Sequence, residues 1–165
     1  MKIFYSFFVL LFVSGCGNFE FVYAPQNDNS KLKKDIHLSV VGDDSSEVFD
    51  ALNSYLGNKP KEVADYELYA NSIRTDTAQV IEKDATASKF KIDYKIEYNL
   101  YSLQKNCSVY KKTLYTENSY ESKSEGYSFG TDFSKKETAK LTINESVRSF
   151  VSSLAAISEL SDCND

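Results

Sequence analysis

The chain has 165 residues, of which 42% are hydrophobic and 26% are charged, and this length fits one globular domain. The formal net charge of −5 argues against nucleic acid as a partner, because a phosphate backbone demands clustered Lys and Arg. Twelve Tyr and eleven Phe beside only two Pro favour long strands over disorder.

The first fifteen residues, 1–15, have the pattern of a bacterial signal peptide. Lys2 supplies a short positive region, and the apolar run over 3–13 is shorter than the roughly 20 residues that a membrane-spanning helix needs. The next segment, 13–16 with the sequence VSGC, resembles the lipobox of bacterial lipoproteins, in which a small residue precedes the cysteine that receives lipid. We therefore expect cleavage before Cys16, a diacylglyceryl thioether on its sulfur, an acyl group on its freed amine, and attachment to a membrane.

The residue after this cysteine indicates which membrane holds the anchor. Gly17 stands where an Asp would favour the inner membrane in the enterobacterial sorting pattern, so the outer membrane is expected and the inner membrane is the alternative. The mature protein would then lie on the periplasmic side, in an oxidising compartment where disulfides persist. Lipidation of Cys16 leaves Cys107 and Cys163 as a candidate pair.

The mature chain opens with a tether. Residues 16–34 contain the lipidated cysteine, Pro25 and a cluster of Asn, Asp and Ser, a composition that is typical of a linker. A single domain is expected over residues 35–165.

This domain is predicted to begin with a short strand and a helix. Residues 36–41 are rich in β-branched side chains, and Gly42 ends the predicted strand. Asp44 precedes Glu47 by three residues, which predicts a capping box at the start of a helix. The helical apolar stripe that follows stops before Gly57, where Asn and Pro also disfavour helix.

Three segments in the middle of the chain predict strands. Residues 64–85 alternate only weakly and leave two alternatives open, a hairpin or one long bent strand. Residues 90–100 alternate strictly between apolar and polar side chains, which is the pattern of a half-buried antiparallel strand. After a polar turn at 104–106, residues 107–120 predict a second long strand rich in Tyr, Thr and Val.

A long helix is expected at the end of the chain. It begins near Asp132 or Ser134, ends near Ser158, and has apolar residues at helical spacing from Ile143 to Ile157. Because both helices and the main strand have one apolar face each, the simplest packing lays the two helices on one face of a mostly antiparallel sheet. The predicted fold class is therefore an α+β two-layer sandwich.

This topology brings Cys107 and Cys163 together. A strand over 107–120 carries the chain about 45 Å, and a helix of about 25 residues returns it by about 38 Å. Cys163 would therefore arrive beside Cys107, and a disulfide would form if the two Cα atoms lie within about 7 Å. The alternative is two free thiols.

Enzyme chemistry has little support, and we expect no catalytic activity. His37 is the only histidine and lies in the first predicted strand, where a structural or surface role is simpler than catalysis. No Cys-x-x-Cys motif, Cys/His cluster or Gly-rich loop provides a site for a metal or a cofactor. Helix capping explains Asp43, Asp44 and Glu47 more simply than acid chemistry does. The 24 acidic residues leave a paired-carboxylate glycosidase open, although no spacing singles out two of them.

The order and the local patterns of these elements resemble the lipopolysaccharide-assembly lipoprotein family (LptE). A lipidated Cys-Gly, the order strand, helix, strands, helix, and the chain length all match that family. Three local patterns are similar to its alphaproteobacterial members: Tyr-x-Leu at 98–100, Ser-Tyr at 119–120, and Gly-Tyr-Ser-Phe at 126–129.

The resemblance implies a non-catalytic subunit that plugs the β-barrel of the lipopolysaccharide translocon (LptD-like) and helps it assemble. Such lipoproteins also contact lipopolysaccharide, whose phosphates call for Lys and Arg. The basic candidates near the predicted strand–helix loop are Lys111, Lys112, Lys123, Lys135 and Lys136. Each of them has a simpler alternative as a solvated lysine, and the alternative function is a free-standing periplasmic binding or inhibitor lipoprotein.

Overall fold

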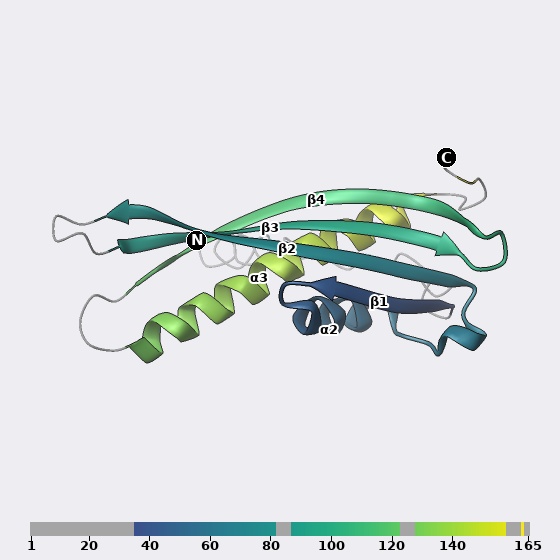
Figure 1. Cartoon of the computed structure of the whole chain (residues 1–165), viewed down its shortest axis with the longest axis horizontal. Helices are drawn as coiled ribbons and strands as arrows, with labels where there is room; N and C mark the ends of the chain where they lie inside the picture. Colours follow the sequence, from purple (N-terminus) through teal and green to yellow (C-terminus); the bar gives the residue numbers. More distant parts are fainter. Residues whose placement is uncertain (1–34, 82–86, 123–127, 158–162, 164–165) are drawn as a thin grey trace, which may run out of the picture.

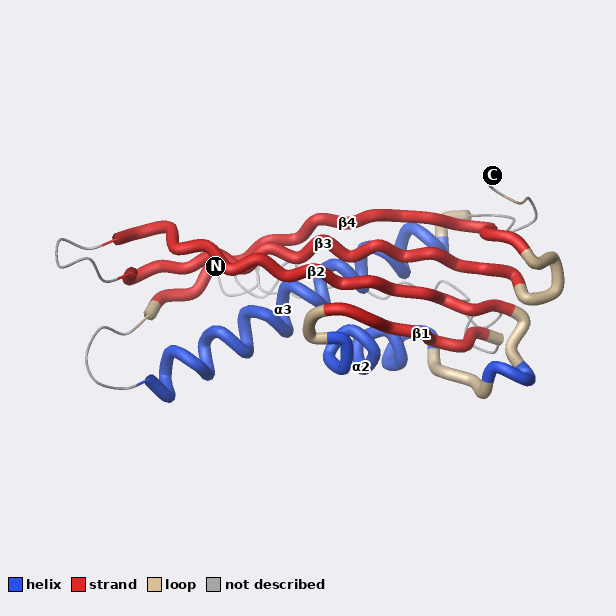
Figure 2. The backbone as a smooth tube through the Cα atoms, viewed as in Figure 1, coloured by secondary structure: helices blue, strands red, loops and turns tan. Residues whose placement is uncertain are grey.

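The computed structural model describes residues 35–81, 87–122, 128–157 and 163, which form one four-stranded sheet with two long helices (Figures 1 and 2). The strand order across the sheet is β1-β2-β3-β4. Strand β1 runs parallel to β2, whereas the β2–β3 and β3–β4 pairs are antiparallel. The elements in chain order are β1 (Ile36–Gly42), α2 (Ser45–Leu56), the short 3-10 helix η2 (Lys61–Val63), β2 (Tyr66–Ile81), β3 (Ala87–Ser102), β4 (Cys107–Glu121) and α3 (Ser128–Ala155).

Both helices cover the same face of the sheet, so the predicted α+β sandwich is confirmed. Helix α2 lies under β1, and α3 crosses the sheet diagonally toward the end where β3 turns into β4 (Figure 1). Because β1 is much shorter than the other strands, the part of the sheet that extends beyond β1 is built from β2, β3 and β4 alone (Figure 2). The opposite face of the sheet carries no helix of the described chain.

Strand β3 shows the alternation that the sequence predicts. Every second side chain faces the helices and is at most 2% exposed: Ile92, Tyr94, Ile96, Tyr98 and Leu100. The intervening charged residues lie on the open face, so β3 supplies the centre of the core with one face only. On α3, Phe150 stacks on Tyr98 with ring centroids 4.2 Å apart, and Ser146 hydrogen-bonds the Tyr98 hydroxyl at 3.0 Å.

Of the two alternatives for residues 64–85, the structure shows one long strand and not a hairpin within this segment. One long strand, β2, runs from Tyr66 to Ile81 and forms a hairpin with β3. The polar stretch around Arg74 belongs to this strand, where Arg74 pairs with Tyr94 across the ladder. The register becomes irregular only between Ala78 and Ile81.

The boundaries of the first strand and helix are explained by two glycines with positive φ. Gly42 has φ 95°, and a Cβ at this position would lie 2.1 Å from the carbonyl oxygen of Ser72. Gly57 has φ 74° and donates its backbone N–H to the carbonyl of Asn53, which ends α2 as predicted.

The predicted capping box at the start of α2 is wrong. Asp44 occupies the N-cap position, but its backbone is left-handed with φ 49° and its side chain makes no capping hydrogen bond. The carboxylate instead binds residues of β2 and β3, because the fold places charged partners there that local sequence spacing does not reveal.

Helix α3 begins earlier and ends earlier than expected. It spans Ser128–Ala155, so residues 128–131, which precede the expected start at Asp132, already belong to the helix. Its buried stripe agrees with the sequence pattern and consists of Ala139, Ile143, Val147, Phe150, Val151 and Leu154.

Candidate functional site

The predicted lysines do not form one cluster. Lys111 and Lys112 are adjacent on β4, so their side chains lie on opposite faces of the sheet, with Lys111 on the open face. Lys135 and Lys136 lie in the N-terminal part of α3. Lys135 acts electrostatically on Tyr120, which is about 26 Å along β4 from Lys112. The structure therefore unites Lys135 with Lys136 but separates this pair from Lys111 and Lys112.

Two predicted site residues, Cys16 and Lys123, lie outside the described residues. Lipidation of Cys16 therefore stays a prediction from the lipobox. Over the described ranges, none of the helices combines the length and the apolar character needed to cross a membrane.

A network of charges joins the β1–α2 turn, strand β2 and helix α3. The Arg74 guanidinium donates twice to Asp76, at 2.7 and 3.1 Å, and once to Asp44 at 3.1 Å. The backbone N–H of Arg74 donates to the carboxylate of Asp43 at 2.9 Å. Lys135 of α3 forms an ion pair with Asp76 at 2.7 Å. Three carboxylates and two cations thus connect elements that are far apart in the sequence.

Tyr94 extends this network to β3. Its hydroxyl donates to Asp44, and its ring lies 5.9 Å from the Arg74 guanidinium carbon. Burial raises the pKa of Tyr94 well above its ordinary value, and the hydrogen bond to Asp44 acts in the same direction. The phenol therefore stays neutral and works as a hydrogen-bond donor.

Arg74 and Asp76 keep their charges over a wide pH range. Burial opposes the charged form of Arg74, but its hydrogen bonds to Asp76 and Asp44 raise its pKa above the ordinary value. Burial likewise opposes the charged form of Asp76, but Arg74 and Lys135 hold the pKa of this carboxyl below 3.8. Arg74 and Asp76 therefore do not exchange protons near neutral pH, and their ion pairs connect strand β2 to the β1–α2 turn and to α3.

A hollow of about 250 Å³ opens beside this network, between the start of α2 and α3. Its lining combines the acids Asp44, Glu47 and Asp132 with the bases Arg74, Lys135, Lys136 and Lys140. Among the described residues, Lys136 and Lys140 form no ion pair, whereas Arg74 and Lys135 are held by carboxylates. Lys140 is not among the lysines predicted from the sequence, although its position four residues after Lys136 places both on one helical face.

The open face of the sheet carries a ladder of opposite charges. Lys91 forms ion pairs with Asp93 at 2.9 Å and with Glu117 of β4 at 3.1 Å. Lys95 forms an ion pair with Glu97 at 2.6 Å along the same strand. The charges on this face are therefore largely balanced.

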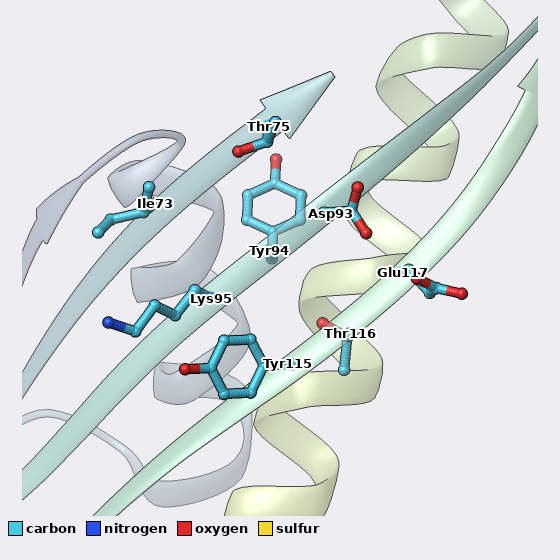
Figure 3. Close-up of a pocket in the computed structure, with 8 residues that line it drawn as sticks. All are labelled: Ile73, Thr75, Asp93, Tyr94, Lys95, Tyr115, Thr116 and Glu117. Atoms are coloured by element: carbon cyan, nitrogen blue, oxygen red, sulfur yellow. The ribbon is translucent and has the colours of Figure 1, made fainter. Parts of the chain in front are cut away.

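Two exposed apolar side chains flank this ladder at Lys95. Ile73 on β2, Lys95 on β3 and Tyr115 on β4 are directly opposite one another in the register. Ile73 is 45% exposed and Tyr115 is 75% exposed, and together they flank a shallow hollow of about 370 Å³ (Figure 3). In the orientation of Figure 3 the helices lie behind the sheet, so this row faces away from them.

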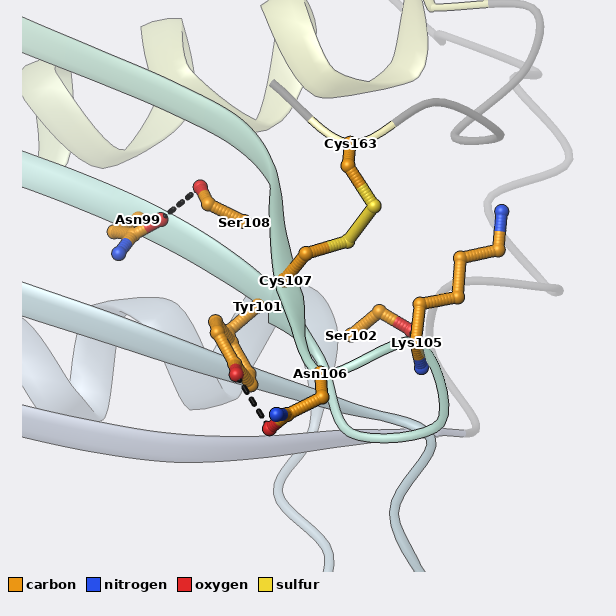
Figure 4. The surroundings of a disulfide bond; sticks show 8 residues. All are labelled: Asn99, Tyr101, Ser102, Lys105, Asn106, Cys107, Ser108 and Cys163. Atoms are coloured by element: carbon orange, nitrogen blue, oxygen red, sulfur yellow. Dashed lines mark hydrogen bonds between the residues drawn. A yellow bond between two sulfur atoms is a disulfide. The ribbon is translucent and has the colours of Figure 1, made fainter. Parts of the chain in front are cut away.

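The structure contains a disulfide between Cys107 and Cys163 at the β3–β4 turn (Figure 4). The two Cα atoms are 5.8 Å apart, in agreement with the pairing that the sequence predicts. The turn itself is held by the Tyr101 hydroxyl, which donates to Asn106 at 2.6 Å. Asn106 adopts φ 55°, a conformation that Asn tolerates better than most residues.

His37 on β1 makes a hydrogen bond that holds a loop in place. Its Nδ1 donates to the backbone carbonyl of Lys59 at 2.8 Å, which fixes the loop after α2 against the strand. Within the described residues, no group of three His, Cys, Asp or Glu side chains could hold a metal ion. The lack of catalytic activity remains a prediction.

Comparison with known proteins gives similarity at the level of structure only. No protein-family model matches the chain, and no curated protein matches it either. A candidate lipoprotein from Caulobacter crescentus superposes with a TM-score of 0.60 at 17% identity, over 77% of this chain and 91% of that one.

Two further solved structures have the same fold. Rare lipoprotein B from Shewanella oneidensis gives a TM-score of 0.55 at 10% identity, covering 74% of this chain and 94% of that chain. A minor lipoprotein from Acinetobacter baumannii gives 0.53 at 14% identity, covering 74% and 89%. At these identities the comparisons show a shared fold, and the proteins that share it are bacterial lipoproteins.

Proposed function

We propose that this chain is a non-catalytic lipoprotein, anchored at Cys16 on the periplasmic side of the outer membrane, that plugs a lipopolysaccharide-exporting β-barrel and helps it assemble. The observation that carries the proposal is the long sheet face that no described helix covers. That face presents paired charges around a few exposed apolar side chains. Such a surface suits the polar interior of an outer-membrane barrel.

The dimensions of the sheet support the same proposal. Strands β2 and β3 each contain 16 residues, which corresponds to about 50 Å at ~3.3 Å per residue. The apolar band of an outer-membrane barrel is about 25 Å tall. A domain of this length can therefore fill a barrel lumen and still extend into the periplasm.

The proposed contact with lipopolysaccharide lies in the hollow beside the charge network. Lys135, Lys136 and Lys140 line it, and Lys135 is already paired with Asp76. Phosphate groups bind such ammonium groups through charge-assisted hydrogen bonds. Lys111 and Lys112 lie away from this hollow, so the proposed contact is with the α3 lysines.

Affinity purification tests the barrel partner directly. The tagged, lipidated full chain is purified from detergent-solubilised outer membranes, and a large β-barrel protein is expected to copurify. Ile73→Asp on the open face should lower this recovery several-fold, because it replaces an exposed apolar side chain of that face by a charge. Leu141→Asp is the matched control, since Leu141 is 64% exposed on α3 and lies away from that face.

Failure of the wild-type chain to recover any barrel would favour the alternative of a free-standing periplasmic lipoprotein. Depletion of the chain gives a second measurement. Under our proposal, depletion lowers the amount of folded barrel and raises outer-membrane permeability to large hydrophobic drugs.

Substitution of the lipidated cysteine tests the anchor. Cys16→Ser removes the only sulfur that the lipobox places at the cleavage site, so incorporation of a fatty-acid analogue should be lost. The variant should accumulate as an uncleaved or unlipidated species. Undiminished labelling would show that the lipid is attached elsewhere.

A further inference from the structure

The two outer edges of the sheet differ in how they are protected. On β1, the loop after α2 covers the edge: the Leu38 N–H donates to the Asn58 side chain at 2.9 Å, and the Lys59 N–H donates to the Ile36 carbonyl at 2.9 Å. On β4, one edge pairs with β3, and no strand of the described chain pairs with the other. From Tyr110 onward, the outward backbone groups of that edge are therefore available to another strand.

Strand β4 also lacks most features that prevent edge pairing. It contains neither Pro nor Gly over 15 residues. Its register against β3 is irregular only near Val109, where Leu100 pairs with Tyr110 and Tyr101 pairs with Ser108. From Tyr110 onward the strand is regular, and it can accept an antiparallel neighbour.

We propose that two copies of this chain associate through antiparallel pairing of their β4 edges, about a two-fold axis that passes through Leu114. In this register Lys111 lies directly opposite Glu117 of the second copy, and the same pair occurs again on the other side of the axis. Thr113 lies opposite Tyr115 of the second copy. Charge pairs and pairs of aromatic with β-branched residues are both favourable cross-strand combinations.

The charges available at this edge support a second copy as the occupant. Lys111 lies on the open face and makes no ion pair with any described residue. The Glu117 side chain is 68% exposed although it also contacts Lys91. An edge that carries both an unpaired base and an exposed acid, symmetrically placed about Leu114, complements itself.

Neighbouring registers are less favourable. A shift of the axis to Tyr115 places Lys111 opposite Ser119, and a shift to Thr113 places it opposite Tyr115, so both lose the charge pair. An axis at Thr116 places Lys111 opposite Glu121 but sets Tyr115 against Glu117. Only the axis at Leu114 combines the charge pairs with the Thr–Tyr pairs.

The resulting dimer has one continuous sheet. A two-fold axis perpendicular to the sheet keeps both open faces on one side and all the helices on the other. This pairing uses the edge of β4 and not the open-face row at Ile73, so it is independent of the proposed barrel contact.

Cysteine cross-linking tests the register. Full-length chains with Lys111→Cys and with Glu117→Cys, carrying different tags, are expressed together. Directly opposite residues have Cα atoms about 4.5–5.5 Å apart, so a heterodimer that disappears on reduction is expected. The matched control pairs Lys111→Cys with Ser119→Cys, and the Lys111→Cys/Glu121→Cys pair tests the other charged register. Cross-linking no stronger than in these two controls would overturn the proposal.

A charge swap tests the complementarity. Lys111→Glu places two acids opposite each other at both ends of the pairing, so copurification of differently tagged copies should fall several-fold. The double variant Lys111→Glu/Glu117→Lys restores opposite charges across the axis and should restore copurification. Loss that the double variant fails to reverse, in protein that retains the native disulfide, would show that these charges do not face each other.

Discussion

Asp76 connects the stability of the domain to pH. Arg74 and Lys135 hold its folded-state pKa below the ordinary value of 3.8, which is the value expected in the unfolded chain. A depressed folded pKa contributes stability that is fully present above the unfolded pKa and is lost as the pH falls through the folded pKa. The Asp76 contribution therefore holds at neutral pH and disappears in strong acid.

Comparison of the wild type with Asp76→Asn at two pH values tests this effect. At pH 7 the variant should unfold at a lower denaturant concentration, because Arg74 and Lys135 lose the Asp76 carboxylate, although Arg74 keeps its ion pair with Asp44. At a pH below the folded pKa of Asp76 the two proteins should differ much less. A difference that does not change with pH would mean that the carboxylate charge does not stabilise the fold.

Substitution of Thr116 is expected to stabilise the domain, in contrast to Asp76→Asn. Its hydroxyl oxygen is buried and has no hydrogen-bond partner among the described residues. A buried polar group without a partner is costly, so Thr116→Val should raise the free energy of unfolding by about 1 kcal/mol. Thr142→Val is the matched control, because the Thr142 hydroxyl donates to the Thr138 carbonyl at 2.7 Å and accepts from Asn118 at 3.2 Å. This control should be destabilised in the same denaturant titration.

At the scale of elements, Gly42 determines how β1 meets α2. A side chain at this position would approach the Ser72 carbonyl, and its φ of 95° is unfavourable for any residue with a Cβ. Gly42→Ala should therefore destabilise the domain by about 2 kcal/mol or more, measured by denaturant unfolding. Ser39→Ala in the same strand serves as the control and should change stability little. A neutral Gly42→Ala would show that the turn can move away from β2.

Which elements could be predicted depended on where their partners lie. Strand β3 was predictable because Ile92, Ile96 and Leu100 alternate with charged residues within one short segment. The extent of β2 was not, because Arg74 and Asp76 face the helices and find their partners on distant elements. Local spacing suggested capping for Asp44, whereas its bonds to Arg74 and Tyr94 require the complete fold.

The candidate site was predictable only in part for the same reason. Lys135 and Lys136 could be named from their position near the start of the last helix. Their association with Arg74 across the hollow depends on how α3 crosses the sheet, which a linear pattern does not contain. The exposed row at Ile73 and Tyr115 likewise arises only when the strands are aligned side by side.

At the scale of the whole molecule, the two ends of α3 are held by different means. Near its start, Lys135 binds Asp76 of β2 through an ion pair that is partly open to solvent. Beyond its end, the disulfide joins Cys163 to the first residue of β4. A surface ion pair contributes little by itself, so the covalent link is expected to dominate the attachment of the helix.

Removal of the disulfide tests how strongly it holds the C-terminal end of α3 to the sheet. It closes a loop with a sequence separation of 56, for which the chain-entropy estimate is roughly 4 kcal/mol. Cys107→Ser/Cys163→Ser should lower the free energy of unfolding by up to about this amount, and should also expose the C-terminal end of α3 to protease first. Thiol counting on denatured, unreduced mature protein measures the bond directly: a lipidated wild type should show no free thiol. Two free thiols would mean that the chain after α3 does not remain beside β4, and the helix would then be held at that end by non-covalent contacts, among them the packing of Phe150 and Leu154 and the hydrogen bond from Tyr110 to Ser153.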